Sequence, residues 1–348
     1  MPLHHYHLAL PVWNRPPWRG RFYAPGTRAA DFLAEYALVF NAVEGNSTFY
    51  ALPSAATVRK WRDAVPPGFR FCWKLPRAAS HDRLLVDAGD ILDAFLATVA
   101  PLGDRLGPCL VQLPPSFGPD QLDDLARFLD EGAAAAASRG VAMAWTVEVR
   151  HPAFFATTMA TGSARVASEV NPASAATALT RLLHAHGASR TVMDTRALRA
   201  ASPADVARPR PGEAAEDTAR RIAESAKALR QKPNLPLPPD LSAETIGPTP
   251  MLRYVADPNP APNEPWLAAW ARDVAGWIAA GVHPTVVIHA PDDVDGAPIA
   301  RLWHAALRRA MAARADEGRP AGYVDEPVDV GELPAWPAER GRQLGLWG

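Results

Sequence analysis

Acidic, basic and amide side chains stand at the ends of most of the short apolar runs in this sequence. In the stretch FNAVEGNSTFYALP, Glu44 and Asn46 close such a run, and the alternation of a strand places both side chains on one face. Groups of this kind move protons in enzymes, and the catalytic candidates are Glu44, Glu148, Asp194 and His289. The candidates for binding a substrate are Trp13, Asn46, Tyr50, Lys74, His81, Gln112, Arg150, Arg196 and Arg253.

The charged groups nearest the expected site include more cations than acids. Guanidinium forks suit phosphate and carboxylate groups, and buried charges are tolerated only when they are paired or bound to a ligand. The pattern therefore predicts a site for an anionic, phosphate-bearing ligand, either a small molecule or nucleic acid. A ring of ion pairs that satisfy one another is the alternative. The acids are Glu44, Glu148 and Asp194, and the cations are Lys74, Arg150, Arg196 and Arg253.

Two other kinds of site use some of the same residues. A divalent metal is not favoured, because four interleaved cations would oppose it and no HExxH or cysteine cluster is present, so the cofactor stays unknown. A glycoside hydrolase would use Glu44 and Glu148 as a carboxylate pair, with aromatic side chains stacking on the sugar. The metal candidates are His81, Glu148, Asp194, His289 and Asp292, and the stacking candidates are Trp13, Phe49 and Tyr50.

Short apolar runs alternate with amphipathic segments along the chain, which favours a parallel sheet with crossover helices. The eight expected strands are 7–13, 39–46, 69–75, 109–113, 143–149, 190–194, 251–255 and 285–289. The eight expected helices are 29–37, 55–64, 90–100, 120–137, 174–185, 213–229, 265–280 and 299–313. These counts predict an α/β fold, a (β/α)8 TIM barrel with its site where the strands end. A long excursion, 197–249, follows the sixth strand and is expected to cover the site.

Several motifs in sequence order resemble one protein family. FNAVEGNSTFYALP and VRKWRDAVPPGFRFCWKLPRAASHDRLL are followed by LGPCLVQLPPSF, TVEVRHPAFF, MDTR, KPNLP and HAPDD. Together they resemble the YecE-like proteins, domain of unknown function family 72. Gly45 stands where that family commonly has an aliphatic residue, and Ser80 stands where it commonly has threonine. The resemblance implies a TIM barrel and no particular reaction.

Composition narrows the setting in which the chain works. The 348 residues are 48% hydrophobic, and 36 basic residues nearly balance 37 acidic ones, so no overall field recruits nucleic acid or an anionic membrane. Two cysteines, Cys72 and Cys109, lie in apolar runs and fit reduced thiols. The beginning of the chain lacks the apolar core of a signal peptide, and no run is long enough to span a membrane. We expect a cytoplasmic protein with no membrane partner.

The composition changes near the end of the chain. We expect a TIM-barrel domain at 1–316 and, at 317–348, a disordered linker and flexible C-terminal tail rich in Pro, Gly and charge. The last residues resemble the peptide by which bacterial repair proteins bind the sliding clamp, and the binding candidates are Gln343, Leu344, Leu346 and Trp347. This suggests a hydrolase or nuclease-like factor in DNA maintenance. A non-catalytic adaptor that binds nucleic acid is the alternative.

Overall fold

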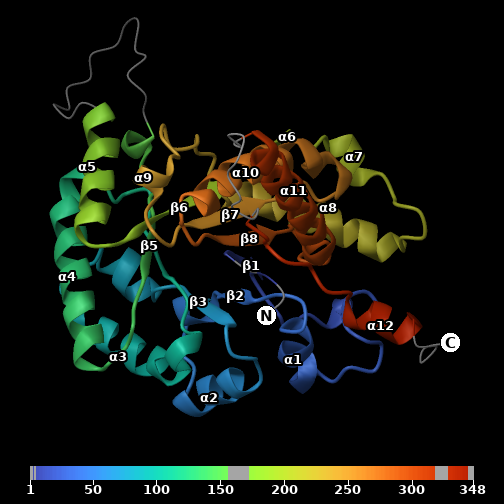
Figure 1. Cartoon of the computed structure of the whole chain (residues 1–348), viewed down its shortest axis with the longest axis horizontal. Helices are drawn as coiled ribbons and strands as arrows, with labels where there is room; N and C mark the ends of the chain where they lie inside the picture. Colours follow the sequence, from blue (N-terminus) through green and yellow to red (C-terminus); the bar gives the residue numbers. More distant parts are fainter. Residues whose placement is uncertain (1–2, 4, 156–171, 318–327, 344–348) are drawn as a thin grey trace, which may run out of the picture.

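The computed structural model describes residues 3, 5–155, 172–317 and 328–343. Its centre is one sheet of eight parallel strands in the order β3-β2-β1-β8-β7-β6-β5-β4, with helices packed around it (Figure 1). The strands are β1 (His7–Leu10), β2 (Ala42–Gly45), β3 (Arg70–Trp73), β4 (Cys109–Gln112), β5 (Trp145–Glu148), β6 (Ser189–Asp194), β7 (Met251–Val255) and β8 (Thr285–His289). All eight predicted strands are present, and most are shorter than expected.

The sheet closes between its first and last members in the order. A parallel bridge joins Lys74 to Leu110, and the backbone amide of Leu75 donates to the carbonyl of Leu110 at 2.9 Å. A second parallel bridge joins Phe71 to Leu106. These bridges join β3 to β4 without a continuous ladder of backbone hydrogen bonds, so the barrel is nearly closed. This confirms the predicted (β/α)8 architecture.

Eight helices correspond to the predicted ones, and further short helices lie in the connections. The predicted helices are α1 (Phe32–Tyr36), α2 (Ala55–Asp63), α3 (Gly89–Val99), α4 (Leu122–Ser138), α5 (Pro172–Ala185), α8 (Ala215–Gln231), α10 (Glu264–Ala279) and α11 (Gly296–Glu317). The excursion after β6 also contains α6 (Arg196–Ala200), α7 (Pro203–Ala207) and α9 (Ala243–Ile246). These three helices are short, and Pro and Gly interrupt the sequence around them. A helical periodicity of apolar residues needs more than one turn to be recognised, so the sequence did not predict them.

The interior of the barrel has an apolar layer below a polar one. Six buried side chains from different strands form the apolar cluster, and they are Ala9, Ala42, Cys72, Leu110, Met251 and Val287. Both cysteines are buried and free. Because side chains alternate along a strand, the residue two positions after each of these faces the same interior, nearer the carboxyl ends of the strands. That register places Glu44, Lys74, Gln112, Arg253 and His289 in one layer.

Gly45 makes room for a large aromatic side chain. A Cβ at this position would lie 2.1 Å from two carbons of the Trp73 ring, closer than any real contact. Trp73 instead stacks on Phe71 and Trp61, with ring centroids 5.9 and 5.5 Å apart. The glycine that departs from the family pattern is therefore matched to the tryptophan on the neighbouring strand.

Residues 328–343 pack on the barrel, although the sequence predicted a linker there. The helix α12 (Pro337–Gln343) lies beside the α1 region in Figure 1, and the amide of Ala338 donates to the carbonyl of Phe22 at 3.1 Å. Glu339 forms an ion pair with Arg301 at 2.8 Å, and the Arg301 guanidinium lies 3.7 Å from the ring centroid of Trp336. Leu344, Leu346 and Trp347 lie outside the described residues, as does the side chain of Gln343.

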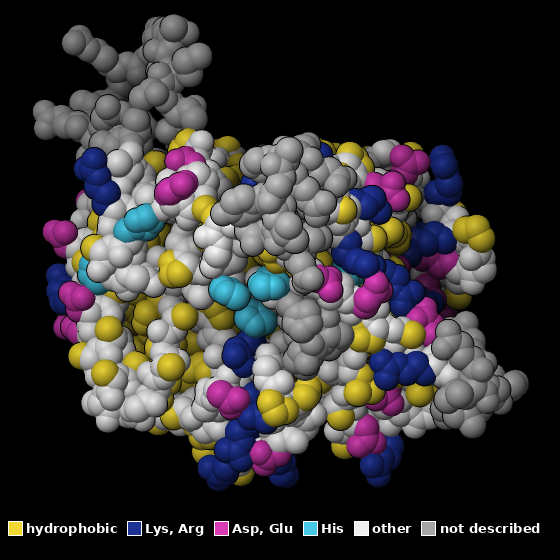
Figure 2. All heavy atoms as spheres, viewed as in Figure 1, with side chains coloured by type: hydrophobic (Ala, Val, Ile, Leu, Met, Phe, Trp, Pro, Cys, Tyr) yellow, Lys and Arg dark blue, Asp and Glu magenta, His cyan; other side chains and the backbone are white. Residues whose placement is uncertain are grey.

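The surface carries both signs of charge close together. Figure 2 shows acidic and basic side chains interspersed over the visible face, in keeping with a formal net charge of −1. Within the described part of the chain, none of the helices combines the length and the hydropathy of a transmembrane span.

Candidate functional site

Arg253 lies at the centre of the polar layer. Its Nε and Nη2 donate to the two carboxylate oxygens of Glu44 at 2.8 and 3.0 Å, and its Nη1 donates to Glu148 at 2.6 Å. Arg150 donates to the other oxygen of Glu148 at 2.8 Å. Glu44, Glu148 and Arg253 are each at most 3% exposed. Strand ends far apart in sequence thus form one buried, hydrogen-bonded network.

Both carboxyl groups of this network are ionised. Burial alone would raise the pKa of Glu148, but the guanidinium groups of Arg150 and Arg253 outweigh burial and lower this pKa to about 2. Burial acts in the same way on Glu44, and Arg253 with His289 holds the pKa of Glu44 well below its usual range. The charges of the two carboxylates and the two guanidinium groups balance, so this part of the site needs no ligand to neutralise it.

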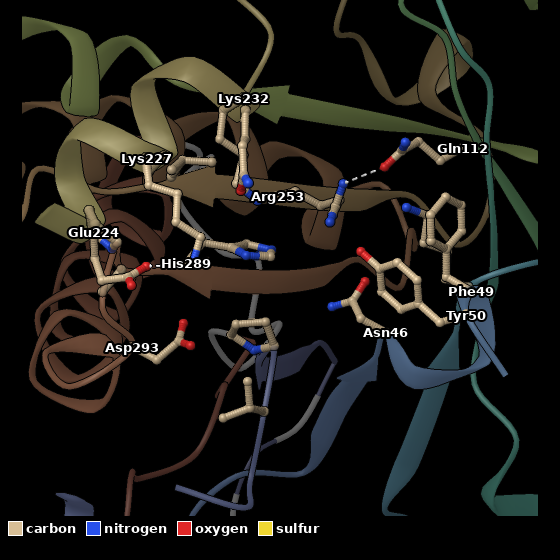
Figure 3. Close-up of a pocket in the computed structure, with 18 of the residues that line it drawn as sticks. Asn46, Phe49, Tyr50, Gln112, Glu224, Lys227, Lys232, Arg253, His289 and Asp293 are labelled. Carbon is tan, nitrogen blue, oxygen red and sulfur yellow. Dashed lines mark hydrogen bonds and ion pairs between the residues drawn. The ribbon is translucent and has the colours of Figure 1, made fainter. Parts of the chain in front are cut away.

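A cavity of about 600 Å³ opens above this network, at the carboxyl ends of the strands. Its lining includes eight of the residues predicted from the sequence, and they are Asn46, Tyr50, Lys74, His81, Gln112, Arg150, Arg253 and His289. In Figure 3, Arg253 and His289 lie between two groups of labelled side chains, one from the β2 loop with Gln112 and one from α8. Glu44 and Glu148 lie beneath the cavity and do not line it.

Lys74 is a buried cation of this cavity that forms no salt bridge with an acidic side chain of the described residues. It is 7% exposed, and its Nζ lies 3.5 Å from the ring centroid of Phe49. The hydroxyl of Thr48 donates to the Lys74 carbonyl at 2.6 Å and ties the strand end to the β2 loop. Burial, followed by the positive charge of Arg253, lowers the pKa of Lys74 to about 7. The amine is therefore partly neutral near neutral pH.

The helix α8 forms one wall of the cavity, as expected for a covering excursion. It contributes Glu224 and Lys227, which form an ion pair at 2.9 Å, and Lys232 directly follows it (Figure 3). Burial lowers the pKa of Lys232 to about 8, with a further contribution from Arg253. These three residues were missed from the sequence. Lys232 is the lysine of the KPNLP motif, so that motif was the available signal.

Asp194 and Arg196 do not reach the cavity. They pair with each other at 2.9 Å, and the indole nitrogen of Trp270 in α10 donates to Asp194 at 2.6 Å, so this pair faces the helix layer. Met193 opposes Arg253 in the ladder between β6 and β7. Met193, and not Asp194, therefore faces the interior of the barrel. Successive side chains of a strand point to opposite faces, so a shift of one position moves a side chain to the other side of the sheet.

Trp13 lies beside the cavity. It lines a neighbouring pocket of about 320 Å³ with Trp61, and their ring centroids are 5.3 Å apart. The two hollows share Pro11, Val12 and Asn46 in their linings. Trp13 is therefore placed to contact an extended ligand and not the centre of the site.

His289 is a neutral imidazole in the wall of the cavity. Burial lowers its pKa to about 4. Its Nε2 is buried and lies 3.5 Å from a Glu44 carboxylate oxygen. The described residues contain no group of three or more His, Cys, Asp or Glu side chains placed to hold a metal ion.

The fold and site define a (β/α)8 barrel with a polar cavity at the carboxyl ends of its strands. The family model for "Protein of unknown function DUF72" matches residues 7–322, and the chain belongs to this family. It is 30% identical over 305 residues to UPF0759 protein YecE of Escherichia coli K12, covering 88% of this chain and 93% of that protein.

Two solved structures of the same family have the same fold. A DUF72 protein from Enterococcus faecalis matches with a TM-score of 0.57 at 16% identity, covering 87% of this chain and 95% of its own. A DUF72 protein from Thermotoga maritima matches with a TM-score of 0.56 at 18% identity, covering 88% of this chain and 100% of its own. At this identity the likeness supports the fold alone.

Proposed function

We propose that the protein binds a small anionic ligand, with a phosphate or carboxylate group, in the cavity above Arg253. One observation carries the proposal: Lys74 and Lys232 line this cavity, and neither forms a salt bridge with a carboxylate of the described residues. Removing an ammonium group from water without a partner is unfavourable, as the lowered pKa values of both lysines reflect. An anion between them would supply the missing partner.

The arginines contribute less to this binding than the sequence suggested. The nitrogens of Arg253 all donate to protein side chains, and Nε and Nη2 of Arg150 are held by Glu148. Arg196 lies outside the cavity. The guanidinium groups therefore form a structural base, while the lysines are the cations that remain for a ligand.

Hydrolysis of a bound phosphate ester would depend on His289. The imidazole is neutral and lines the cavity, so it is the candidate base for an attacking water molecule. Glu44 and Glu148 are poorly suited to glycoside hydrolysis, because both have lowered pKa values and neither can act as the protonated acid that the reaction needs. A non-catalytic adaptor that binds nucleic acid would show saturable binding and no product.

Thermal unfolding in phosphate tests the proposal. A ligand that binds only the folded state raises the melting temperature with its concentration, so phosphate should stabilise the protein and chloride at matched ionic strength should not. Lys232→Met should abolish the difference between the salts. Lys60→Met is the control, because it removes the same charge from an exposed lysine on α2 that does not line the cavity. Equal shifts in both salts, or an undiminished phosphate effect in Lys232→Met, would overturn the proposal.

A further inference from the structure

We propose that Lys74 forms a Schiff base, and that the ligand of the cavity is a small anionic compound that carries an aldehyde or ketone. This inference rests on the proposed anion site and divides the work between its two lysines. Lys232 would hold the anionic group, and Lys74 would react with the carbonyl carbon.

Lys74 is held at the end of β3 and inside the barrel. Its backbone is fixed by the parallel bridge to Leu110 and by the hydrogen bond from Thr48. Its side chain lies along the face of Phe49, with Nζ 3.5 Å from the ring centroid. A rigid strand and a packed ring keep the amine in one direction, which a nucleophile needs in order to meet a bound carbonyl carbon.

The surroundings of Lys74 disfavour its charge. Arg253 and Arg150 line the same cavity, and the carboxylates near Lys74 already pair with these two guanidinium groups. The Phe49 face favours an ammonium ion, whereas burial and the like charge of Arg253 oppose it. The resulting pKa of about 7 leaves an appreciable fraction of neutral amine at neutral pH. Burial beside other cations is a known way to activate a lysine.

Lys232 and Lys74 reach the cavity from different elements. Burial lowers the pKa of both amines, of Lys74 to about 7 and of Lys232 to about 8. Lys232 comes from the covering segment after α8, whereas Lys74 comes from the barrel wall. One lysine can therefore fix the charged end of a ligand while the other faces its carbonyl group.

Formation of the Schiff base needs no reactant besides the amine of Lys74 and the carbonyl compound. The lone pair of Nζ attacks the carbonyl carbon and forms a carbinolamine. The carbonyl oxygen then leaves as water with the two amine hydrogens, and a C=N bond replaces the C=O bond. An imine draws electrons from the neighbouring carbon, so a bond at that carbon can break with a base such as His289 in the same cavity. This use of the site would replace hydrolysis.

Reductive trapping tests the inference in the full-length protein. Dihydroxyacetone phosphate, glyoxylate and pyruvate are the anionic probes, and uncharged dihydroxyacetone is the control that differs from the first probe only in its phosphate group. Cyanoborohydride supplies hydride to the imine carbon and converts the adduct to a stable secondary amine. Intact mass and peptide mapping should show one adduct, on Lys74, formed at least tenfold faster with dihydroxyacetone phosphate than with dihydroxyacetone.

Four variants make the result specific. Lys74→Met and Lys74→Arg should give no adduct, and Lys232→Met should lose the preference for the anionic probe. Lys60→Met should behave as the unchanged protein, because Lys60 is exposed on α2 and does not line the cavity. The trapping rate should rise with pH and reach half its maximum near 7, in contrast to exposed lysines. Absence of an adduct on Lys74 with all three anionic probes, or adducts formed equally on Lys60, Lys227 and Lys232, would overturn the inference.

The two proposals fail in different ways. If phosphate gives no specific stabilisation but dihydroxyacetone still reacts at Lys74, the anion site is wrong and the reactive amine stands. If phosphate stabilises the protein and no probe reacts, the anion site stands and the Schiff base is wrong. A loss of folding in Lys74→Met, checked by circular dichroism, leaves Lys74→Arg and Lys232→Met to decide.

Discussion

Arg253 and Glu44 meet in a two-point contact, with Nε to Oε2 at 2.8 Å and Nη2 to Oε1 at 3.0 Å, although 209 positions separate them in the chain. The third nitrogen of the same guanidinium reaches Glu148. Planar bidentate geometry and burial make such contacts strong and directional. The contact joins β7 to β2 and β5 across the barrel, and it also forms the base of the cavity.

Glu148→Gln should destabilise the fold strongly. The change leaves Arg253 and Arg150 with one carboxylate between them in a buried layer, and breaking a buried pair costs about 3–5 kcal/mol. Urea unfolding followed by circular dichroism measures the loss. Glu224→Gln is the control, because its partner Lys227 is half exposed and such surface pairs contribute about 1 kcal/mol or less. Equal effects of the two changes would contradict a structural role for the network.

The free energy of unfolding should fall on acidification over two separate pH ranges. The folded-state pKa of His289 is lowered from 6.5 to about 4, so the unfolded chain binds this proton first and stability falls between these values. The folded-state pKa of Glu148 is lowered from 4.5 to about 2, so its stabilisation is present above 4.5 and is lost as the pH falls to 2. Unfolding free energies at several pH values check the signs. His289→Gln should reduce the slope over the upper range and leave the lower one unchanged, while His7 and His81, whose pKa values are also lowered to about 4, supply the remaining slope.

Gly45→Ala should destabilise the barrel. The added methyl group would lie 2.1 Å from the Trp73 ring, and overpacking of this kind costs about 1–3 kcal/mol. Gly26→Ala is the control, because nothing lies within 4 Å of a Cβ at Gly26. Trp73→Leu should reduce the penalty of Gly45→Ala in the double variant. The melting temperature reports all three effects, and an additive double variant would show that the two residues are not coupled.

The end of the chain yields a separate prediction about partners. A synthetic peptide of residues 340–348 should bind bacterial sliding clamp at micromolar strength, because Leu344, Leu346 and Trp347 can act as buried anchors in a small interface. Leu346→Ala with Trp347→Ala should abolish binding. Calorimetric titration measures both peptides and the full-length protein. No heat of binding at tens of micromolar from either unchanged species would remove the support for a role in DNA maintenance.

Periodicity and strand-end chemistry predicted much of this protein from its sequence. Eight apolar runs became eight strands, and Asn46, Lys74, Gln112 and His289 were recognised as lining one site because parallel strands end on one face of a barrel. The same reasoning failed at Asp194. A strand end shows that a polar group leaves the sheet, but only the register with Arg253 decides which side it faces.

The sequence by itself determined the eight-fold alternation, the near balance of charge and the residue types at the barrel mouth, since these depend on local spacing. Only the tertiary structure decided which charged side chains pair with one another and which remain available to a ligand. Arg253 and Arg150 looked equivalent to Lys74 as ligand-binding cations, yet the arginines are held by carboxylates and the lysine is not. Pairing depends on distances across the barrel, between residues far apart in the chain, so no local pattern encodes it.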